Sequence, residues 1–199
     1  MDYSAFFAYV FFMTFTPGPS NAMVMSIASK HGFVKTLRFM SGVILGLFTI
    51  FTASSIFASK LYELLPKIEP ILLCIGSVYL LFLAWIIWRD KPEEEKKTIQ
   101  AKGLISGLVL QLVNAKLYIF ALSALTIFLL PNYKQLIDLF PFILIICLIG
   151  ITASCSWALF GAILEKVLGK YKKVINLLLA LFLVYCAISQ LINFFREIL

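Results

Sequence analysis

Lys116 is the residue of this sequence best placed to do chemistry, because it is the single charge between Gly103 and Tyr133. About thirteen residues separate it from Gly103 and about fifteen from Pro131, or roughly 20 Å of helix in either direction. A lysine side chain cannot reach water over that distance. A charge at such depth in a membrane helix costs at least about 2.5 kcal/mol, so it indicates function.

The partner of Lys116 must come from outside the usual set of carboxylates, because all ten acidic residues lie outside the apolar stretches. Three possibilities are open. The amine binds an anionic substrate group or couples ion movement, it bonds the Met13 and Phe15 carbonyls, or it has no partner. Nearby, Gln111 and Asn114 share a helix face at the i, i+3 spacing. They hydrogen-bond either a polar solute or a neighbouring helix.

A second polar motif lies deep in the first uncharged stretch. It consists of Thr16, Pro17, Gly18, Pro19, Ser20 and Asn21. Proline has no N–H and its ring clashes with the preceding turn, so the two prolines remove bonds that the Met13 and Phe15 carbonyls would accept. The helix should therefore break here. Unpaired backbone at membrane depth is tolerated only beside protein or a watery cavity, so the break predicts a cavity.

Beyond the break, we expect Ser20 or Asn21 to cap a new half-helix. The N–H groups and positive dipole at such a helix start suit a carboxylate. A packing kink without a ligand is the alternative, and two prolines among Thr, Gly, Ser and Asn favour a binding site. The predicted substrate site comprises this motif with Gln111, Asn114 and Lys116. Ser154, Ser156 and Trp157 are weaker candidates, for which helix packing is the expected role.

Six apolar stretches must position these residues. Uncharged stretches cover 3–29, 39–59, 70–88, 139–164 and 174–195, and the stretch 103–133 carries Lys116 alone. The chain is 62% hydrophobic and 14% charged, whereas soluble domains are about 25% charged. A spanning helix takes roughly 20 residues. The sequence therefore predicts an all-α membrane protein of six transmembrane helices, the first of them broken.

The charged segment 89–102 divides the chain into two halves of three helices, 1–88 and 103–199. Because three is odd, the second half enters the membrane in the opposite sense to the first. That geometry is an inverted repeat, which many secondary transporters share. We treat residues 1–199 as a single membrane domain with 89–102 as a cytoplasmic linker.

Basic residues are distributed unevenly between the two sets of loops. One set holds only Lys60, Lys67, Lys134 and Arg196, and the other holds twelve of the 17 lysines and arginines. Basic loops resist translocation, so a multi-pass protein of the cell membrane with both termini outside is expected. This asymmetry explains the net charge of +7, and a nucleic-acid partner is not needed to account for it.

Several activities are disfavoured by what the apolar stretches lack. They contain no cluster of Asp, Glu or His for a metal ion, and no nucleophile with a base for catalysis. We therefore expect no enzyme activity, cofactor or metal site. The cysteines, at positions 74, 147, 155 and 186, form no C-x-x-C pair and are expected as small buried residues. Gly42 and Gly46 predict a close helix contact within the chain.

With these motifs in view, the chain resembles the LysE/RhtB family of amino-acid exporters. The resemblance covers the whole length and rests on Thr16-Pro17-Gly18-Pro19, on Gly32, Gly42 and Gly46, and on Gly107, Gln111, Asn114 and Lys116. The family usually has Asn-Pro-Lys in its fourth helix. Ala115 replaces that proline here, which removes one reason for a break near Asn114.

The resemblance implies export of an amino acid or a related small metabolite, driven by an ion gradient of protons or sodium. The lipid bilayer is the expected environment, and a homo-oligomer is compatible with it. Two alternatives remain open at this point. One is an exporter of another small solute or cation in the same superfamily, and the other is a membrane scaffold that transports nothing.

Overall fold

The computed structural model describes residues 1–89, 103–168 and 172–198, and every regular element in these ranges is a helix. The all-α class is therefore confirmed for the described chain, while linker residues 90–102 lie outside it. The helices are α1 (Tyr3–Phe15), α2 (Pro19–His31), α3 (Phe33–Ile56), α4 (Ala58–Arg89), α6 (Gly103–Leu112), α7 (Ala115–Ser123), the π-helix η1 (Ala124–Leu129), α8 (Leu136–Leu168) and α9 (Lys172–Ile198).

The predicted break in the first apolar stretch is confirmed. α1 ends at Phe15 and α2 begins at Pro19, which occupies the first helical position. The capping prediction was wrong, because Gly18 is the N-cap and no side-chain cap bond is made. The reason is that proline's fixed φ suits the first helical position. The helix therefore starts one residue before Ser20.

The fourth apolar stretch is also broken, although no proline lies near the break. α6 and the continuous pair α7–η1 are bent by 62° at Val113 and Asn114. Asn114 is extended, with φ −89° and ψ 96°, and its N–H donates to the Gln111 carbonyl at 3.2 Å. Asparagine side chains compete with helical backbone bonds. The break at Asn114 therefore does not depend on the proline that Ala115 replaces.

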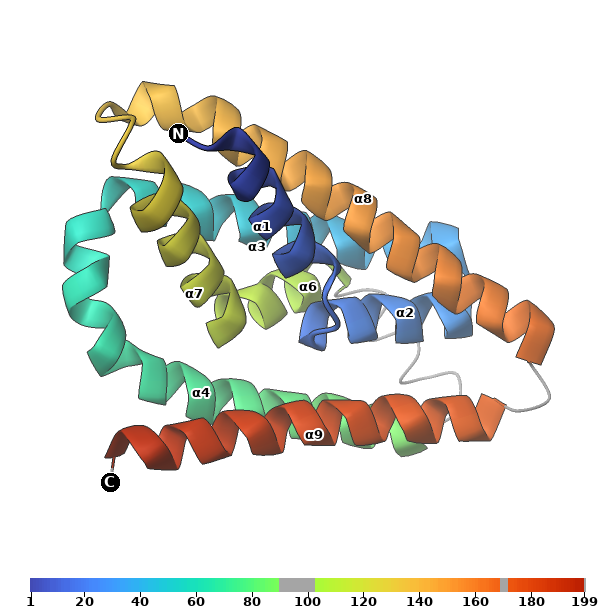
Figure 1. The fold of residues 1–199 in the computed structure, drawn as a ribbon. Coiled ribbons are helices and arrows are strands. Elements are labelled where there is room, and N and C mark those ends of the chain that lie inside the picture. Colours follow the sequence, from blue (N-terminus) through green and yellow to red (C-terminus); the bar gives the residue numbers. More distant parts are fainter. Residues whose placement is uncertain (90–102, 169–171, 199) are drawn as a thin grey trace.

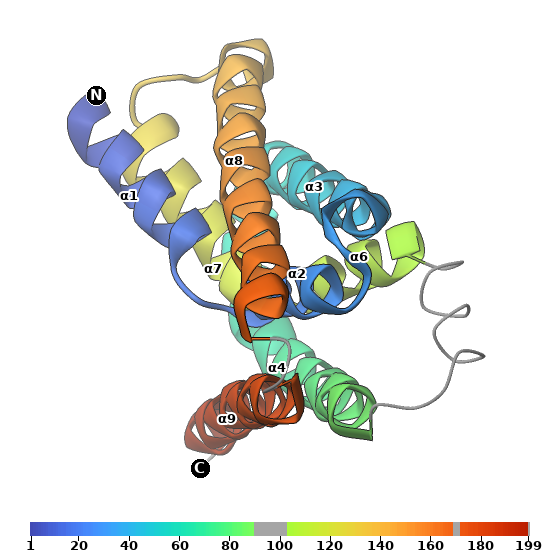
Figure 2. The same ribbon diagram turned by 90° about the vertical axis from the view of Figure 1, so that its right-hand side faces the viewer.

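The half-helices lie between the long helices. α3 and α8 pass along them, and α4 and α9 pack against each other as a separate pair (Figures 1 and 2). Both chain ends lie at one end of the molecule, whereas the turn from α2 to α3 lies at the other (Figure 1). Two apolar clusters form the core, one centred on α2, α4 and α9, the other on α1, α3, α7 and α8.

Glycines allow two helix pairs to approach closely. A Cβ on Gly42 would collide with the Leu104 backbone, and one on Gly107 would collide with the Phe39 carbonyl, so α3 and α6 are in backbone contact. Gly161 of α8 meets the Met25 carbonyl of α2 in the same way. The predicted close contact at Gly42 within one chain is therefore confirmed.

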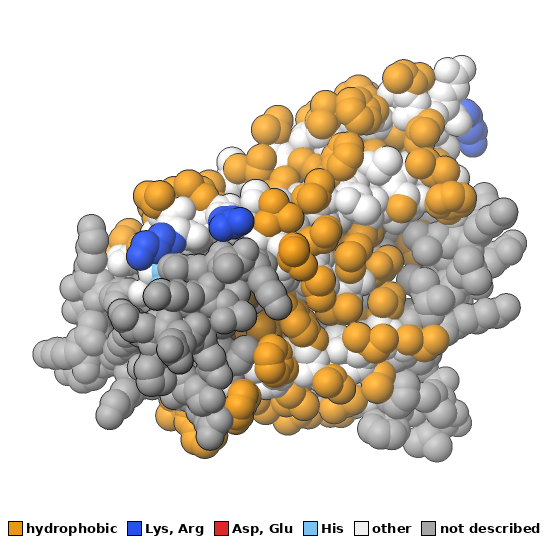
Figure 3. Space-filling view, turned by 180° about the vertical axis from the view of Figure 1, so that it is seen from behind, with side chains coloured by type: hydrophobic (Ala, Val, Ile, Leu, Met, Phe, Trp, Pro, Cys, Tyr) orange, Lys and Arg blue, Asp and Glu red, His pale blue; other side chains and the backbone are white. Residues whose placement is uncertain are grey.

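The described surface suits a lipid environment. Phe33–Ile56 and Leu136–Leu164 are long and apolar enough to cross a membrane, and the bent pair Gly103–Leu112 with Ala115–Leu129 counts as a third span if taken together. Hydrophobic side chains dominate the face in Figure 3, and its lysines and arginines lie toward the two ends. The count of six spans and the inverted repeat remain predictions.

Candidate functional site

A cavity lies where the two helix breaks meet. Seven of the nine predicted site residues line it: Gly18, Pro19, Ser20, Asn21, Gln111, Asn114 and Lys116. The remaining wall comes from the end of α1, the middle of α3, α7 and α8. Its volume of about 70 Å³ is several times the ~10–15 Å³ that one water molecule needs. The break between α1 and α2 therefore adjoins a cavity, as the sequence predicted.

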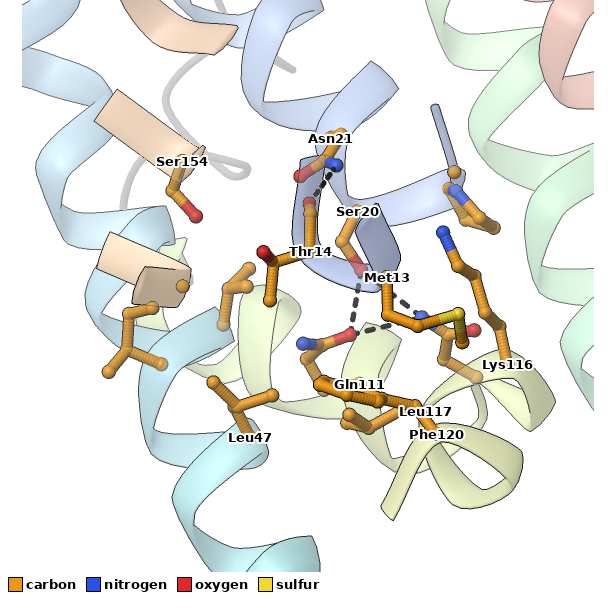
Figure 4. Close-up of a pocket in the computed structure, with 16 residues that line it drawn as sticks. Met13, Thr14, Ser20, Asn21, Leu47, Gln111, Lys116, Leu117, Phe120 and Ser154 are labelled. Atoms are coloured by element: carbon orange, nitrogen blue, oxygen red, sulfur yellow. Dashed lines mark hydrogen bonds between the residues drawn. The ribbon is translucent and has the colours of Figure 1, made fainter. Parts of the chain in front are cut away.

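Buried polar side chains join one break to the other. Ser20 Oγ donates to Gln111 Oε1 at 2.7 Å, and Asn114 Nδ2 donates to the same oxygen at 3.1 Å (Figure 4). Asn114 Nδ2 also lies 3.4 Å from Ser20 Oγ. All three residues are less than a tenth exposed. Asn114 Oδ1 is buried without a hydrogen-bond partner in the described chain, so one acceptor of the network is left over.

Side chains from three helices supply donors to the carbonyls that the first break frees. Asn21 Nδ2 of α2 donates to the Thr14 carbonyl at 2.8 Å and to that of Thr16 at 3.1 Å. Lys116 Nζ of α7 donates to the Thr16 carbonyl at 3.3 Å. Trp157 Nε1 of α8 donates to the Phe15 carbonyl at 3.3 Å. Side chains, two of them from distant parts of the sequence, thus replace several missing helical bonds.

Of the three possibilities left open for Lys116, the structure shows a bond to a carbonyl of the first break, although not to either carbonyl named for it. The Lys116 amine bonds the Thr16 carbonyl and not those of Met13 or Phe15. The reason is local: Thr16 has left the helix with ψ 136°, so its carbonyl no longer follows the axis of α1. Trp157, for which packing was expected, supplies the donor that Phe15 needs.

Positive charge gathers on one side of the cavity. The backbone N–H groups of Ser20 and Asn21 lie in the first turn of α2, where no intrahelical acceptor exists and no side chain caps them. Lys116 Nζ approaches the same turn, because a Cβ on Gly18 would lie 3.3 Å from it. Among the residues that the structure describes, no acidic side chain lines the cavity. A carboxylate is the ligand that this arrangement would favour.

Thr16 and Pro17 lie outside the cavity lining. The Thr16 hydroxyl turns back to the Phe12 carbonyl, so Thr16 serves the site through its own carbonyl. Pro17 lines a second, apolar cavity of about 410 Å³ between α2, α8 and α9, together with Met25, Trp157 and Phe182. Within the motif 16–21, Pro17 therefore lines the apolar cavity and residues 18–21 line the polar one.

Sequence reasoning missed most of the residues that complete the cavity wall. Thr14 comes from the last turn of α1, Leu47 from α3, Phe120 from α7, and Gly150 and Ser154 from α8. In Figure 4, Ser154 and Lys116 lie on opposite sides of the cavity. Only Ser154 carried a signal, as a hydroxyl within an uncharged helix. The others resemble ordinary helix residues until the packing is known.

Metal and disulfide chemistry have no support in the described chain. None of its Asp, Glu, His and Cys residues form a group of three or more that would hold a metal ion. Cys74, Cys147, Cys155 and Cys186 are free thiols. The polar lining of the cavity therefore consists of hydrogen-bonding side chains and one lysine.

Comparison with known proteins covers nearly the whole chain. Residues 11–193 match the family model described as LysE type translocator. A cysteine/O-acetylserine efflux protein of Salmonella typhi is 33% identical, covering 93% of this chain and 95% of the relative. Proteins of the same description from Klebsiella pneumoniae and Escherichia coli are 32% and 30% identical, covering 96% and 93% of this chain and 97% and 95% of theirs. No solved structure matches this chain.

Proposed function

This chain belongs to the LysE type translocator family, and we propose that it exports small amino acids or closely related metabolites through the cavity between its two helix breaks. As a member of that family it is a membrane transport protein and not an enzyme. Cysteine and O-acetylserine are the first substrates to test, because they are named for relatives that are similar over their whole length.

One observation carries the proposal: Lys116 and the uncapped start of α2 approach the same cavity, and no acidic side chain of the described residues lines it. A substrate carboxylate would accept hydrogen bonds from the N–H groups of Ser20 and Asn21. Lys116 would supply the opposite charge, because its bond to Thr16 uses one of three N–H donors. The carboxylate would thus take the place of an acidic partner.

The remaining polar residues have different roles in this proposal. Gln111 and Asn114 position polar groups of the substrate, and the unpartnered Asn114 Oδ1 is the acceptor available for a donor such as an ammonium. Asn21 supports the site indirectly, because both of its amide contacts are to carbonyls of the break. Pro17 and Thr16 shape the break.

The transport cycle that we propose uses the two halves of the chain as moving parts. Residues 1–88 and 103–199 would each cross the membrane three times in opposite senses, with both termini outside. Rocking of one half against the other would expose the cavity to each side in turn. An ion gradient would drive export, with Lys116 as the charged group nearest the substrate.

The experiment is efflux of radiolabelled amino acids from proteoliposomes, with cysteine and O-acetylserine first. Lys116→Ala should lower the initial rate about tenfold or more, because a hydrogen bond to a charged group contributes ~1.5–3 kcal/mol and 1.4 kcal/mol is a factor of ten. Lys134→Ala is the matched control, since Lys134 is exposed in the turn before α8. It should export at the unmodified rate.

The outcomes separate this site from the alternatives. Full activity of inserted Lys116→Ala would show that the substrate site lies elsewhere. If the unmodified protein exports another solute and no amino acid, the alternative of a different small solute or cation would be favoured. Collapsing the proton gradient and the sodium gradient separately would identify the coupling ion as the one whose loss stops export. Unchanged export in both cases would refute gradient coupling.

A further inference from the structure

Among the side chains that the structure describes, Trp157 is the one donor at the first break from a helix that neither adjoins the break in sequence nor takes part in the second break. Its indole Nε1 lies 3.3 Å from the Phe15 carbonyl, across 142 positions of sequence. In a continuous helix that carbonyl would accept from the N–H of residue 19, and Pro19 has none. The indole therefore replaces the backbone donor that Pro19 lacks.

The indole is held by packing as well as by this bond, because Trp157 is partly buried against the apolar cluster centred on α2, α4 and α9. The side chain lines the apolar cavity of about 410 Å³ together with Pro17 and residues of α9. Its ring contact with Phe160 is edge-on at 6.4 Å between centroids, which is near the outer limit for an aromatic pair. Packing therefore holds the ring, and the hydrogen bond fixes the direction of its N–H toward the Phe15 carbonyl.

The bond connects the second half of the chain to the first half at the break between α1 and α2. α8 belongs to the second half, and backbone contact at Gly161 with Met25 holds it against α2. Trp157 lies one turn of α8 before Gly161, and its N–H reaches past the start of α2 to the last residue of α1. One helix therefore holds both sides of the break.

We propose that Trp157 is a positioning residue for substrate binding, whose indole N–H holds α1 and the start of α2 in the arrangement that directs the Ser20 and Asn21 N–H groups at the cavity. This inference rests on the proposed function. Trp157 lines the second cavity and not the first, so it acts through the break and does not touch the substrate. Loss of its N–H should weaken substrate binding.

Two replacements separate the hydrogen bond from the packing. Trp157→Phe keeps an aromatic ring and loses the donor. Trp157→Gln loses the ring and keeps an N–H donor at a similar reach from the backbone. Trp88→Phe is the matched control, because Trp88 of α4 is 64% exposed and lines neither cavity.

In proteoliposome efflux, Trp157→Phe should raise KM about 3- to 10-fold, the effect of losing one hydrogen bond, with a smaller change in maximal rate. Trp157→Gln should be closer to the unmodified protein, and Trp88→Phe should equal it. An unchanged KM in Trp157→Phe, or a larger defect in Trp157→Gln than in Trp157→Phe, would overturn the proposal. The second result is what a purely packing role predicts.

Hydrogen exchange of residues 12–24 gives a readout that needs no transport. Exchange at the start of α2 should be faster in Trp157→Phe than in Trp157→Gln or Trp88→Phe, because the break is no longer held. If the unmodified protein exports no amino acid, the proposed function fails. Faster exchange in Trp157→Phe than in the other variants would still show that the indole N–H stabilises the break. Equal exchange in all variants would refute that stabilisation.

Discussion

At the scale of residues, the carbonyls freed by the break between α1 and α2 organise the surroundings of the cavity. Thr14, Phe15 and Thr16 each accept from a side chain, and the donors come from α2, α7 and α8. A buried carbonyl without a donor costs about as much as a lost hydrogen bond, so such replacements are required at membrane depth. The polar residues of the break are therefore partly structural.

Asn21 offers the clearest test of this role. Asn21→Ala leaves the Thr14 carbonyl without its side-chain donor, and should lower the free energy of unfolding by about 1–3 kcal/mol. Asn21→Asp should be worse, because a carboxylate would face two carbonyl oxygens. Thermal unfolding in detergent measures both. If the aspartate variant were as stable as the unmodified protein, the amide N–H contacts would have no structural importance.

At the scale of elements, the two breaks differ in how far the sequence predicts them. Two prolines and a glycine end α1, and steric arguments from the residues alone were sufficient. The break after α6 has no such residue. It occurs at Asn114, the N-cap of α7, whose side chain bonds Gln111 of α6 and approaches Ser20 of α2. A break that depends on a partner about 90 positions away cannot be found from local propensity.

The same contrast holds for the site. Lys116, Gln111 and Asn114 stand out because polar groups in an apolar stretch need an explanation. Leu47 and Phe120, which also line the cavity, are ordinary core residues in composition. The helical periodicity of an apolar stretch gives no facing direction when every side is apolar. Only the packing of α3 against the breaks assigns them to the cavity.

Helix packing at α6 leads to a paired prediction. A Cβ at Gly107 would collide with the Phe39 backbone, whereas one at Gly103 would lie at an ordinary 3.6 Å from Arg38. Gly107→Ala should therefore destabilise the protein by about 1–3 kcal/mol through overpacking. Gly103→Ala should be nearly neutral. Thermal unfolding of the two variants, made on the same helix, checks the contact, and equal stabilities would mean that α3 and α6 separate without cost.

At the scale of the whole molecule, polarity is arranged along the long axis. Lys134 lies in the turn at the end that holds both chain termini, and Met1 donates its ammonium N–H to Asn132 in that turn at 3.0 Å. Lys30, Lys35 and Arg38 lie around the α2–α3 turn at the other end. The apolar surface between them fits a membrane. This separation of the two ends is what an orientation experiment needs.

The predicted orientation places the termini outside. In a variant whose four cysteines are replaced by alanine, Lys134→Cys should react with a membrane-impermeant thiol reagent on intact cells. Lys35→Cys, exposed at the opposite end, should react only after permeabilisation. The reverse pattern would place the termini inside, and reaction of both positions would indicate two orientations.

The long-range donors at the first break also constrain the biosynthesis of the chain. Phe15 leaves the ribosome 142 residues before Trp157, and Thr16 leaves it 100 residues before Lys116. At about 5–20 residues per second, the Phe15 carbonyl waits roughly 7–28 s for its donor. Until Lys116 is synthesised, Asn21 is the one member of these three side-chain donors that the nascent chain contains. The nascent first segment is therefore expected to stay beside water, in the insertion channel or at the membrane interface, until the second half arrives.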